Sequence, residues 1–201
     1  LADYSVRDIQ EDRFGNIFIA TPSGVSKFDG TTFTTLTPIN SSKNEWKLMP
    51  DDLWFSCNGN LKDVYRYDGA SLFQLQLPKH DLIKTFNLSP NDLRFNPYAV
   101  FGIDKDRKGN VWFGTLLAGA YRYDGESFLW FGEKELSILE DGRVPGVRSM
   151  VEDKDGNFWL SNFISKYRVN EENSGARYEK LKGMDYSKGH FQNKLGYFNS
   201  G

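Results

Sequence analysis

The sequence contains very little cysteine and histidine, and this narrows the chemistry that it can carry. Its single cysteine, Cys57, excludes an internal disulfide and a thiolate-ligated metal site. Its two histidines, His80 and His190, lie outside the repeated segments described below, whereas a catalytic triad or a zinc site needs histidine together with partners. We therefore expect no metal, no cofactor and no histidine-based catalytic set.

A strong excess of one charge and a long apolar run are also missing. The chain has 25 Lys and Arg against 27 Asp and Glu, interspersed along its length, whereas nucleic acids and anionic membranes favour a basic patch. No apolar run approaches the roughly 18 residues that span a bilayer. We expect no nucleic-acid partner and no membrane insertion of this segment. The start at Leu1, without a signal-peptide pattern, indicates a removed leader or a shortened chain.

Aromatic residues are abundant instead, at 15% of the chain, and they favour β-strands. The sequence also repeats itself, because four segments align, at residues 6–36, 47–77, 100–131 and 147–181. Gly109 and Gly156 lie 47 residues apart, and Gly15 lies two such periods before Gly109. This spacing matches the roughly 40 to 50 residues of a propeller blade.

Each copy can be divided into four short strands joined by hairpins. An alternating strand leads to a Gly-Asn turn, a nearly continuous apolar strand follows, as in NIFIAT and VWFGT, and a third strand ends on Asp-Gly, as in VSKFDG. The second copy lacks the Gly-Asn turn, and the fourth has Asn170 in place of Asp-Gly. One aromatic marks the second strand of every copy: Phe18, Trp54, Trp112 and Trp159. We expect the three tryptophans to pack between neighbouring sheets.

A four-stranded sheet of this kind buries both faces only when it stacks on neighbours. We therefore predict an all-β fold, a β-propeller of four-stranded antiparallel blades, with four blades visible in this chain. They span about 6–38, 44–78, 96–133 and 144–183, as a closed ring of four or as part of a larger ring. Residues 184–201 indicate a connector or the start of a further blade. A β-sandwich is the alternative fold, but it would not need the repeat.

The repeat resembles that of the two-component regulator propeller family of bacteria. The resemblance is carried by EDRFGNIFIATPSGVSKFDG, DKDRKGNVWFGTLLAGAYRYDG and EDKDGNFWLSNFISKYRVN. Members of that family commonly form the extracytoplasmic sensor part of large hybrid receptors, where they receive a glycan-derived signal. The resemblance implies a noncatalytic recognition module, periplasmic or extracellular, with an oligosaccharide or a protein as ligand. The chain has no kinase or DNA-binding segment of such a receptor, and fold alone does not set function.

Two other functions stay open: a propeller enzyme, either a polysaccharide lyase or a glycosidase, and a structural or protein-interaction scaffold. Asp104 and Asp106 could form an acid–base pair, and Asp153 and Asp155 begin like a calcium loop, but both pairs fit hairpin turns better. We therefore name no catalytic and no metal-binding residue. The candidates for an aromatic binding rim are three rings outside the second strands, namely Trp46, Tyr98 and Trp130.

Overall fold

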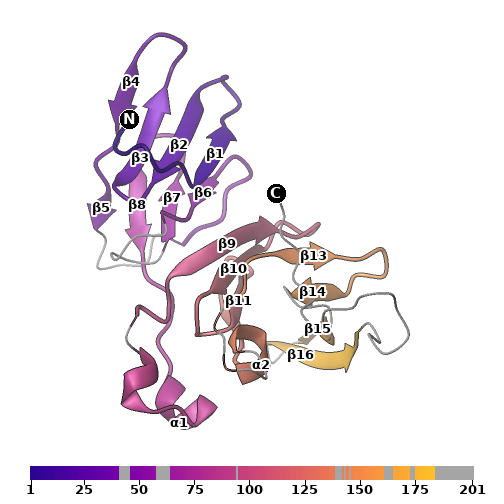
Figure 1. The fold of residues 1–201 in the computed structure, drawn as a ribbon. Coiled ribbons are helices and arrows are strands. Elements are labelled where there is room, and N and C mark those ends of the chain that lie inside the picture. The colour runs from indigo at the N-terminus through magenta and orange to yellow at the C-terminus, as the bar shows by residue number, and fades with distance from the viewer. Residues whose placement is uncertain are drawn as a thin grey trace, which may run out of the picture.

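The computed structural model describes residues 1–40, 46–57, 64–93, 95–138, 142, 144, 146–160, 165–172 and 175–183. The strands of this part of the chain form four sheets of four strands each, which follow one another in chain order (Figure 1). We call these sheets blades 1 to 4, counted from the N-terminus. The predicted all-β class and the four-stranded blades are confirmed. The predicted role of residues 184–201 and the place of His190 lie outside the described residues.

Blades 1, 3 and 4 are antiparallel sheets in which each strand pairs with the next along the chain. Blade 1 consists of β1 (Asp8–Glu11), β2 (Ile17–Thr21), β3 (Gly24–Phe28) and β4 (Phe33–Thr35). Blade 3 consists of β9 (Val100–Lys105), β10 (Val111–Thr115), β11 (Ala120–Tyr123) and β12 (Phe128–Phe131). Blade 4 consists of β13 (Met150–Glu152), β14 (Phe158–Leu160), β15 (Ser165–Glu172) and β16 (Gly175–Lys182).

Blade 2 differs from the prediction in one strand. Its order is β5 (Ile39–Asn40), β8 (Leu72–Leu75), β7 (Val64–Tyr67) and β6 (Leu53–Phe55), and β5 pairs in parallel with β8. No described strand precedes β6 in the place that β1, β9 and β13 hold in the other blades. The reason is local, because the segment before β6 turns at Pro50, with the Asp52 N–H donating to the carbonyl of Met49.

Consecutive blades are held together by three hydrophobic clusters. We define the front face of a blade as the face that carries its second-strand aromatic, and the back face as the opposite one. Phe18, Trp54 and Trp112 are at most 2% exposed, and each packs from a front face onto the back of the next blade. Trp159, on the front of blade 4, is only half-buried. The expected packing is therefore confirmed for Trp54 and Trp112, and Phe18 of blade 1 packs in the same way.

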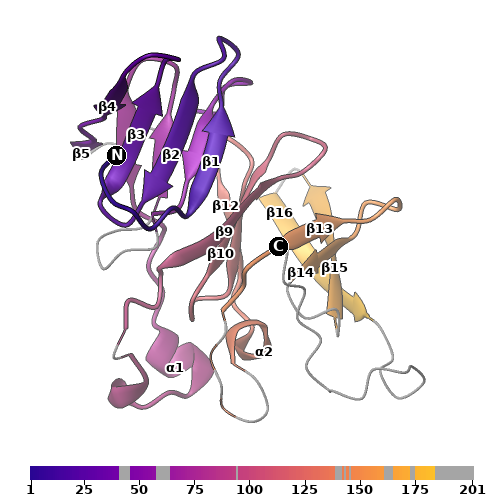
Figure 2. The same cartoon turned by 45° about the horizontal axis from the view of Figure 1, so that its top comes forward.

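Two long connectors interrupt the strands. The connector between β8 and β9 carries α1 (Leu82–Phe86) and the 3-10 helix η1 (Pro90–Leu93), and the connector between β12 and β13 carries α2 (Lys134–Ser137). Both α-helices lie at the same end of the sheets, which we call the connector end (Figures 1 and 2). Within the described ranges, the helices are too short and too polar to cross a membrane.

Candidate functional site

The connector end holds a cavity of about 530 Å³. Three separate segments line it: the β8–β9 connector, the loop between β10 and β11, and the β12–β13 connector. The described residues that line it are Leu88, Phe95, Pro97, Leu116, Leu117, Lys134, Ile138, Gly142 and Val144. Its size falls within the roughly 300 to 1,000 Å³ of pockets that bind small molecules.

Backbone hydrogen bonds join the first wall of the cavity, the β8–β9 connector, to the second wall, the β10–β11 loop. In the β10–β11 loop, the Leu116 N–H donates to the carbonyl of Ala99 at 2.9 Å, and the Leu117 N–H donates to that of Pro97 at 2.9 Å. Both acceptors belong to the β8–β9 connector. The connector is thereby held against the sheet, although it contributes no strand of its own.

The third wall is fixed to the same loop. Gly119 N–H donates to the hydroxyl of Ser137 in α2 at 3.1 Å, and Val147 N–H donates to the carbonyl of Thr115 at 2.8 Å. Gly146 has a positive φ of 74°, and a Cβ atom there would lie 2.9 Å from the Thr115 oxygen. The three walls therefore share one scaffold, so the cavity is formed before any ligand arrives.

The lining of the cavity is apolar, with one charge. Lys134 is the only charged side chain among the described lining residues, and it is exposed. Phe95 is 73% exposed, so its ring stands in solvent beside the cavity. A separate general acid and general base would need two titratable groups within reach of a substrate, and Lys134 is the only one in the described lining. This arrangement can bind an apolar ligand and attract an anionic group.

Two of the three rings proposed for a binding rim surround His80 in the β8–β9 connector. The His80 ring stacks on the indole of Trp130 with centroids 3.7 Å apart. The Tyr98 hydroxyl donates to the His80 carbonyl at 2.9 Å and accepts from its N–H at 2.7 Å. Burial lowers the pKa of His80, and its buried Nε2 atom has no hydrogen-bond partner in the described structure. Within the described ranges, no carboxylate is hydrogen-bonded to His80 Nε2, whereas the histidine of a catalytic triad is oriented by one.

The third ring, Trp46, lies in the core. It is 2% exposed and packs on Trp54 and Phe113 between blades 2 and 3, and Tyr98 is also buried, at 7% exposed. None of the three rings is among the described lining residues of the cavity, so a binding rim built from them stays a prediction. The unusual length of the connectors was the only sequence signal for the cavity, because its lining residues fit no motif.

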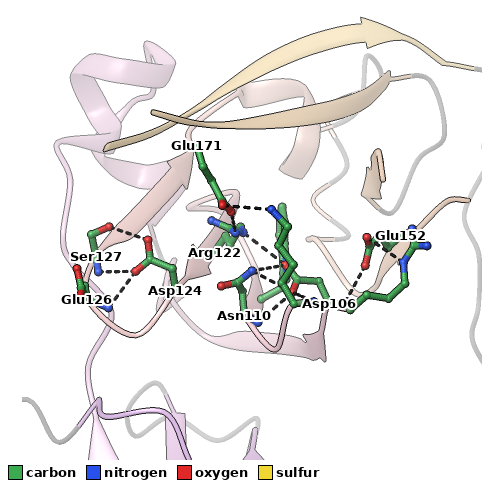
Figure 3. A network of polar contacts seen from close by, with 11 residues as sticks. Asp106, Asn110, Arg122, Asp124, Glu126, Ser127, Glu152 and Glu171 are labelled. Carbon is green, nitrogen blue, oxygen red and sulfur yellow. Dashed lines mark hydrogen bonds and ion pairs between the residues drawn. The ribbon is translucent and has the colours of Figure 1, made fainter. Parts of the chain in front are cut away.

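The carboxylates of the first hairpin turns form a repeated polar device, and Figure 3 shows the one around Asp106 in blade 3. In blade 3, Asp106 accepts hydrogen bonds from the Asn110 side chain at 2.9 Å, the Trp112 indole at 3.0 Å and Arg122 at 3.4 Å. Burial alone would raise the pKa of Asp106, but these partners outweigh burial and lower it. The device explains why aspartate and asparagine recur together in the turns, and in blade 3 why a tryptophan follows them; in blade 1 the aromatic is Phe18, which has no N–H to donate.

Blade 4 repeats the device and thereby supports the turn interpretation of Asp153. Its carboxylate accepts from the Asn157 side chain at 3.2 Å and from the Trp159 indole at 3.0 Å. Burial raises the pKa of Asp153, yet the hydrogen bonds prevail and bring it to about 2. Among the described residues, no group of three or more His, Cys, Asp or Glu side chains could hold a metal ion.

Comparison with known proteins gives similarity at the level of fold. No protein-family model and no curated protein matches this sequence. The extracellular domain of a hybrid two-component system from B. thetaiotaomicron is 17% identical, with a TM-score of 0.53 over 89% of this chain and 25% of that one. The extracellular domain of a one-component system from the same organism is 16% identical, with a TM-score of 0.53 over 93% and 25%.

A catalytically inactive virginiamycin B lyase from Staphylococcus aureus, solved with quinupristin, is 15% identical, with a TM-score of 0.47 over 90% of this chain and 56% of that one. The chain therefore spans about half of the lyase and about a quarter of each extracellular domain. Similarity at such identity concerns the fold alone. Together with the four stacked blades, it shows that this chain has a β-propeller fold like that of the two bacterial extracellular domains.

Proposed function

We propose that this chain is a noncatalytic recognition module that binds a small ligand in the cavity at the connector end. The observation that carries the proposal is the cavity itself, about 530 Å³ in volume, lined mainly by apolar side chains and built on a single hydrogen-bonded scaffold. Lys134 is the only titratable group in its described lining. Such a site supports binding without supplying an acid–base pair.

By analogy of fold with the two bacterial extracellular domains, recognition serves a signalling system outside the cytoplasm, in the periplasm or beyond the cell. An oligosaccharide ligand follows from the family resemblance of the repeat. The described lining adds a second ligand class, since Leu116, Leu117 and Ile138 offer apolar surface and few hydrogen-bonding groups for sugar hydroxyls. An apolar ligand that carries an anionic group near Lys134 fits this lining better.

A thermal-shift screen tests the proposal with two panels, oligosaccharides and medium-chain carboxylates such as decanoate, with product analysis by mass spectrometry in the same wells. A ligand that binds only the folded state raises the unfolding temperature, so we expect stabilisation without turnover. Leu116→Asn should reduce that stabilisation, whereas Ile83→Asn changes a 40% exposed side chain in α1 that does not line the cavity. Turnover, or equal effects of both substitutions, would contradict the proposal.

A further inference from the structure

Three aromatic side chains surround His80 at the beginning of the β8–β9 connector. The His80 ring lies parallel to the indole of Trp130 in β12, with centroids 3.7 Å apart and an angle of 4° between the rings. It also stacks on Tyr121 in β11, with centroids 5.8 Å apart. The Tyr98 hydroxyl is bonded to both the backbone N–H and the carbonyl of His80. We call these four residues the His80 cluster.

The His80 cluster joins the segments that form the cavity. Tyr98 directly follows Pro97, which lines the cavity, and its contact with His80 ties the end of the β8–β9 connector to its beginning. The Trp130 indole N–H donates to the carbonyl of Ala118 at 2.7 Å, directly after the lining residues of the β10–β11 loop. The stacking of His80 on Trp130 therefore holds the first wall of the cavity against the second.

The charged groups nearest to His80 in the chain have other contacts. Lys79 and Asp81 flank it, and both are exposed. The Lys79 ammonium lies over the Tyr98 ring, 3.9 Å from its centroid, and the Asp81 carboxylate accepts from the Lys84 N–H at 3.1 Å. The two rings of the cluster that come from β11 and β12 are uncharged at neutral pH. In the described part of the chain, no carboxylate therefore bonds to His80 Nε2 and stabilises a protonated ring.

A protonated imidazole fits the cluster poorly. Protonation turns both ring nitrogens into hydrogen-bond donors. His80 Nε2 is buried and has no hydrogen-bond partner among the described residues, so the added N–H would be desolvated without an acceptor. Burial accordingly lowers the pKa of His80 from its ordinary value of 6.5. A solvated His80 on an undocked connector would keep the ordinary pKa, so it would bind a proton more readily than the docked one.

We infer that His80 positions the first wall of the cavity and that protonation of its ring loosens this wall. Above pH 6.5 the ring is neutral in the docked and the undocked state, so the docked state has its full stability. Below pH 6.5 the undocked state binds protons first, and one pH unit lower its population has risen by up to about tenfold. The functional meaning of this inference rests on the proposed ligand site, because a ligand there contacts the docked wall.

NMR titration of the whole chain gives the first test. The chain has two histidines, so His190→Gln assigns the ring signals of His80. We expect His80 to titrate with a pKa below 6.5. A pKa at or above 6.5 would overturn the inference, because it would show that the face of the Trp130 indole stabilises the protonated ring.

Hydrogen–deuterium exchange tests the loosening at pH 7.5 and 5.5, one unit on either side of 6.5. After correction for the intrinsic exchange rate at each pH, the amides of α1 should exchange up to about tenfold faster at the lower pH, whereas those of β10 should not change. His80→Phe keeps a planar ring against Trp130 but does not titrate, so it should abolish the difference. His190→Gln is the matched control and should retain it.

Two results of the exchange experiment would overturn the inference. One is equal exchange of the α1 amides at both pH values in the natural chain, and the other is a difference that His80→Phe retains. The second result would assign the pH dependence to another titrating group.

A ligand probe separates this inference from the proposed ligand site. Decanesulfonate, used below its micellar concentration, combines an apolar chain with an anion that stays charged at both pH values. If it binds beside the docked connector, it should slow exchange of the α1 amides at both pH values. No protection by decanesulfonate or by decanoate would contradict the proposed site, and the pH series would still decide the role of His80. Absence of the pH dependence would overturn the role of His80 even where a ligand protects α1.

Discussion

At the scale of single residues, the turn aspartates explain the repeat. Asp12, Asp106 and Asp153 each accept a hydrogen bond from the backbone N–H and from the side chain of the asparagine four positions later. The glycine between them has a positive φ in each case, so the Gly-Asn turns expected from sequence are present. Of the carboxylates that could suggest a glycosidase or a calcium loop, Asp106 and Asp153 are therefore engaged in holding hairpins. Asp104 lies in β9 instead and accepts a hydrogen bond from the Met150 N–H of blade 4 at 3.0 Å.

The buried members of this device should matter most for stability. Asp106→Ala removes the acceptor of Asn110, Trp112 and Arg122, whose side chain is 2% exposed. We expect a loss of about 3 kcal/mol in the free energy of unfolding, measured by urea denaturation, because a buried cation loses a carboxylate partner. The control, Asp124→Ala, removes an exposed hairpin carboxylate and should cost about 1 kcal/mol. If both substitutions lowered the free energy of unfolding equally, the contacts of Asp106 with Asn110, Trp112 and Arg122 would not be more stabilising than an exposed hairpin carboxylate.

The same aspartates should make the protein sensitive to acid. Burial alone would raise the pKa of Asp153 above its ordinary value of 3.8. The hydrogen bonds to its carboxylate outweigh burial and lower the pKa to about 2. A lowered pKa contributes stability that is complete above pH 4 and is lost as the pH falls through the window from 3.8 to about 2. We expect the unfolding midpoint in urea to fall over this window.

Asp153→Asn should flatten part of that pH dependence, because the amide does not titrate there. Asp155→Asn is the matched control, since Asp155 lies in the same turn and is exposed. The unfolding midpoint of all three proteins would be measured over the same pH series. If Asp153→Asn kept the full acid dependence of the natural chain, the hydrogen bonds to Asp153 would not be its source.

At the scale of elements, blade 2 shows how the fold tolerates a missing strand. Its edge strand β6 presents backbone carbonyls that β1, β9 and β13 would cover in the other blades. Side chains from both neighbours do so instead: Gln10 donates to the Trp54 carbonyl at 2.6 Å, and Lys105 donates to the Asp52 carbonyl at 2.9 Å. Gln10 lies in β1 and Lys105 in β9, the first strands of the blades on either side.

These two side chains should stabilise the edge of β6. We expect Gln10→Ala and Lys105→Ala each to lower the free energy of unfolding by about 1 kcal/mol, since each leaves a partly buried carbonyl without a donor. Lys47→Ala, at an exposed position before β6, is the control and should have little effect. Urea denaturation measures all three. No difference from the control would mean that water satisfies the carbonyls equally well.

The sequence predicted the elements that carry a local signal and missed those that depend on distant contacts. Gly-Asn turns and apolar second strands located the strands of blades 1, 3 and 4, because these signals act within a few residues. The two-residue strand β5 has no pattern of its own and forms only because β8 offers a free edge. The cavity could not be predicted from the sequence either, because its walls meet only after the β8–β9 connector and α2 dock on the β10–β11 loop.

At the scale of the whole molecule, stability follows the stack. The hydrophobic clusters join blades 1 and 2, 2 and 3, and 3 and 4. Among the described residues, blades 2 and 3 are therefore covered on both faces, and blades 1 and 4 on one. In stacked repeats, stability is approximately the sum of each unit and its contacts with its neighbours. The single chain should therefore open from its ends, and the largest cluster, around Trp46 between blades 2 and 3, should open last.

Hydrogen–deuterium exchange followed by mass spectrometry tests this order. In dilute protein we expect the amides of β2 and β14 to exchange faster than those of β10, because local opening is easiest where a sheet has one uncovered face. Uniform protection of all three strands in dilute protein would show that the chain unfolds as one cooperative unit and that its ends are no weaker than its centre.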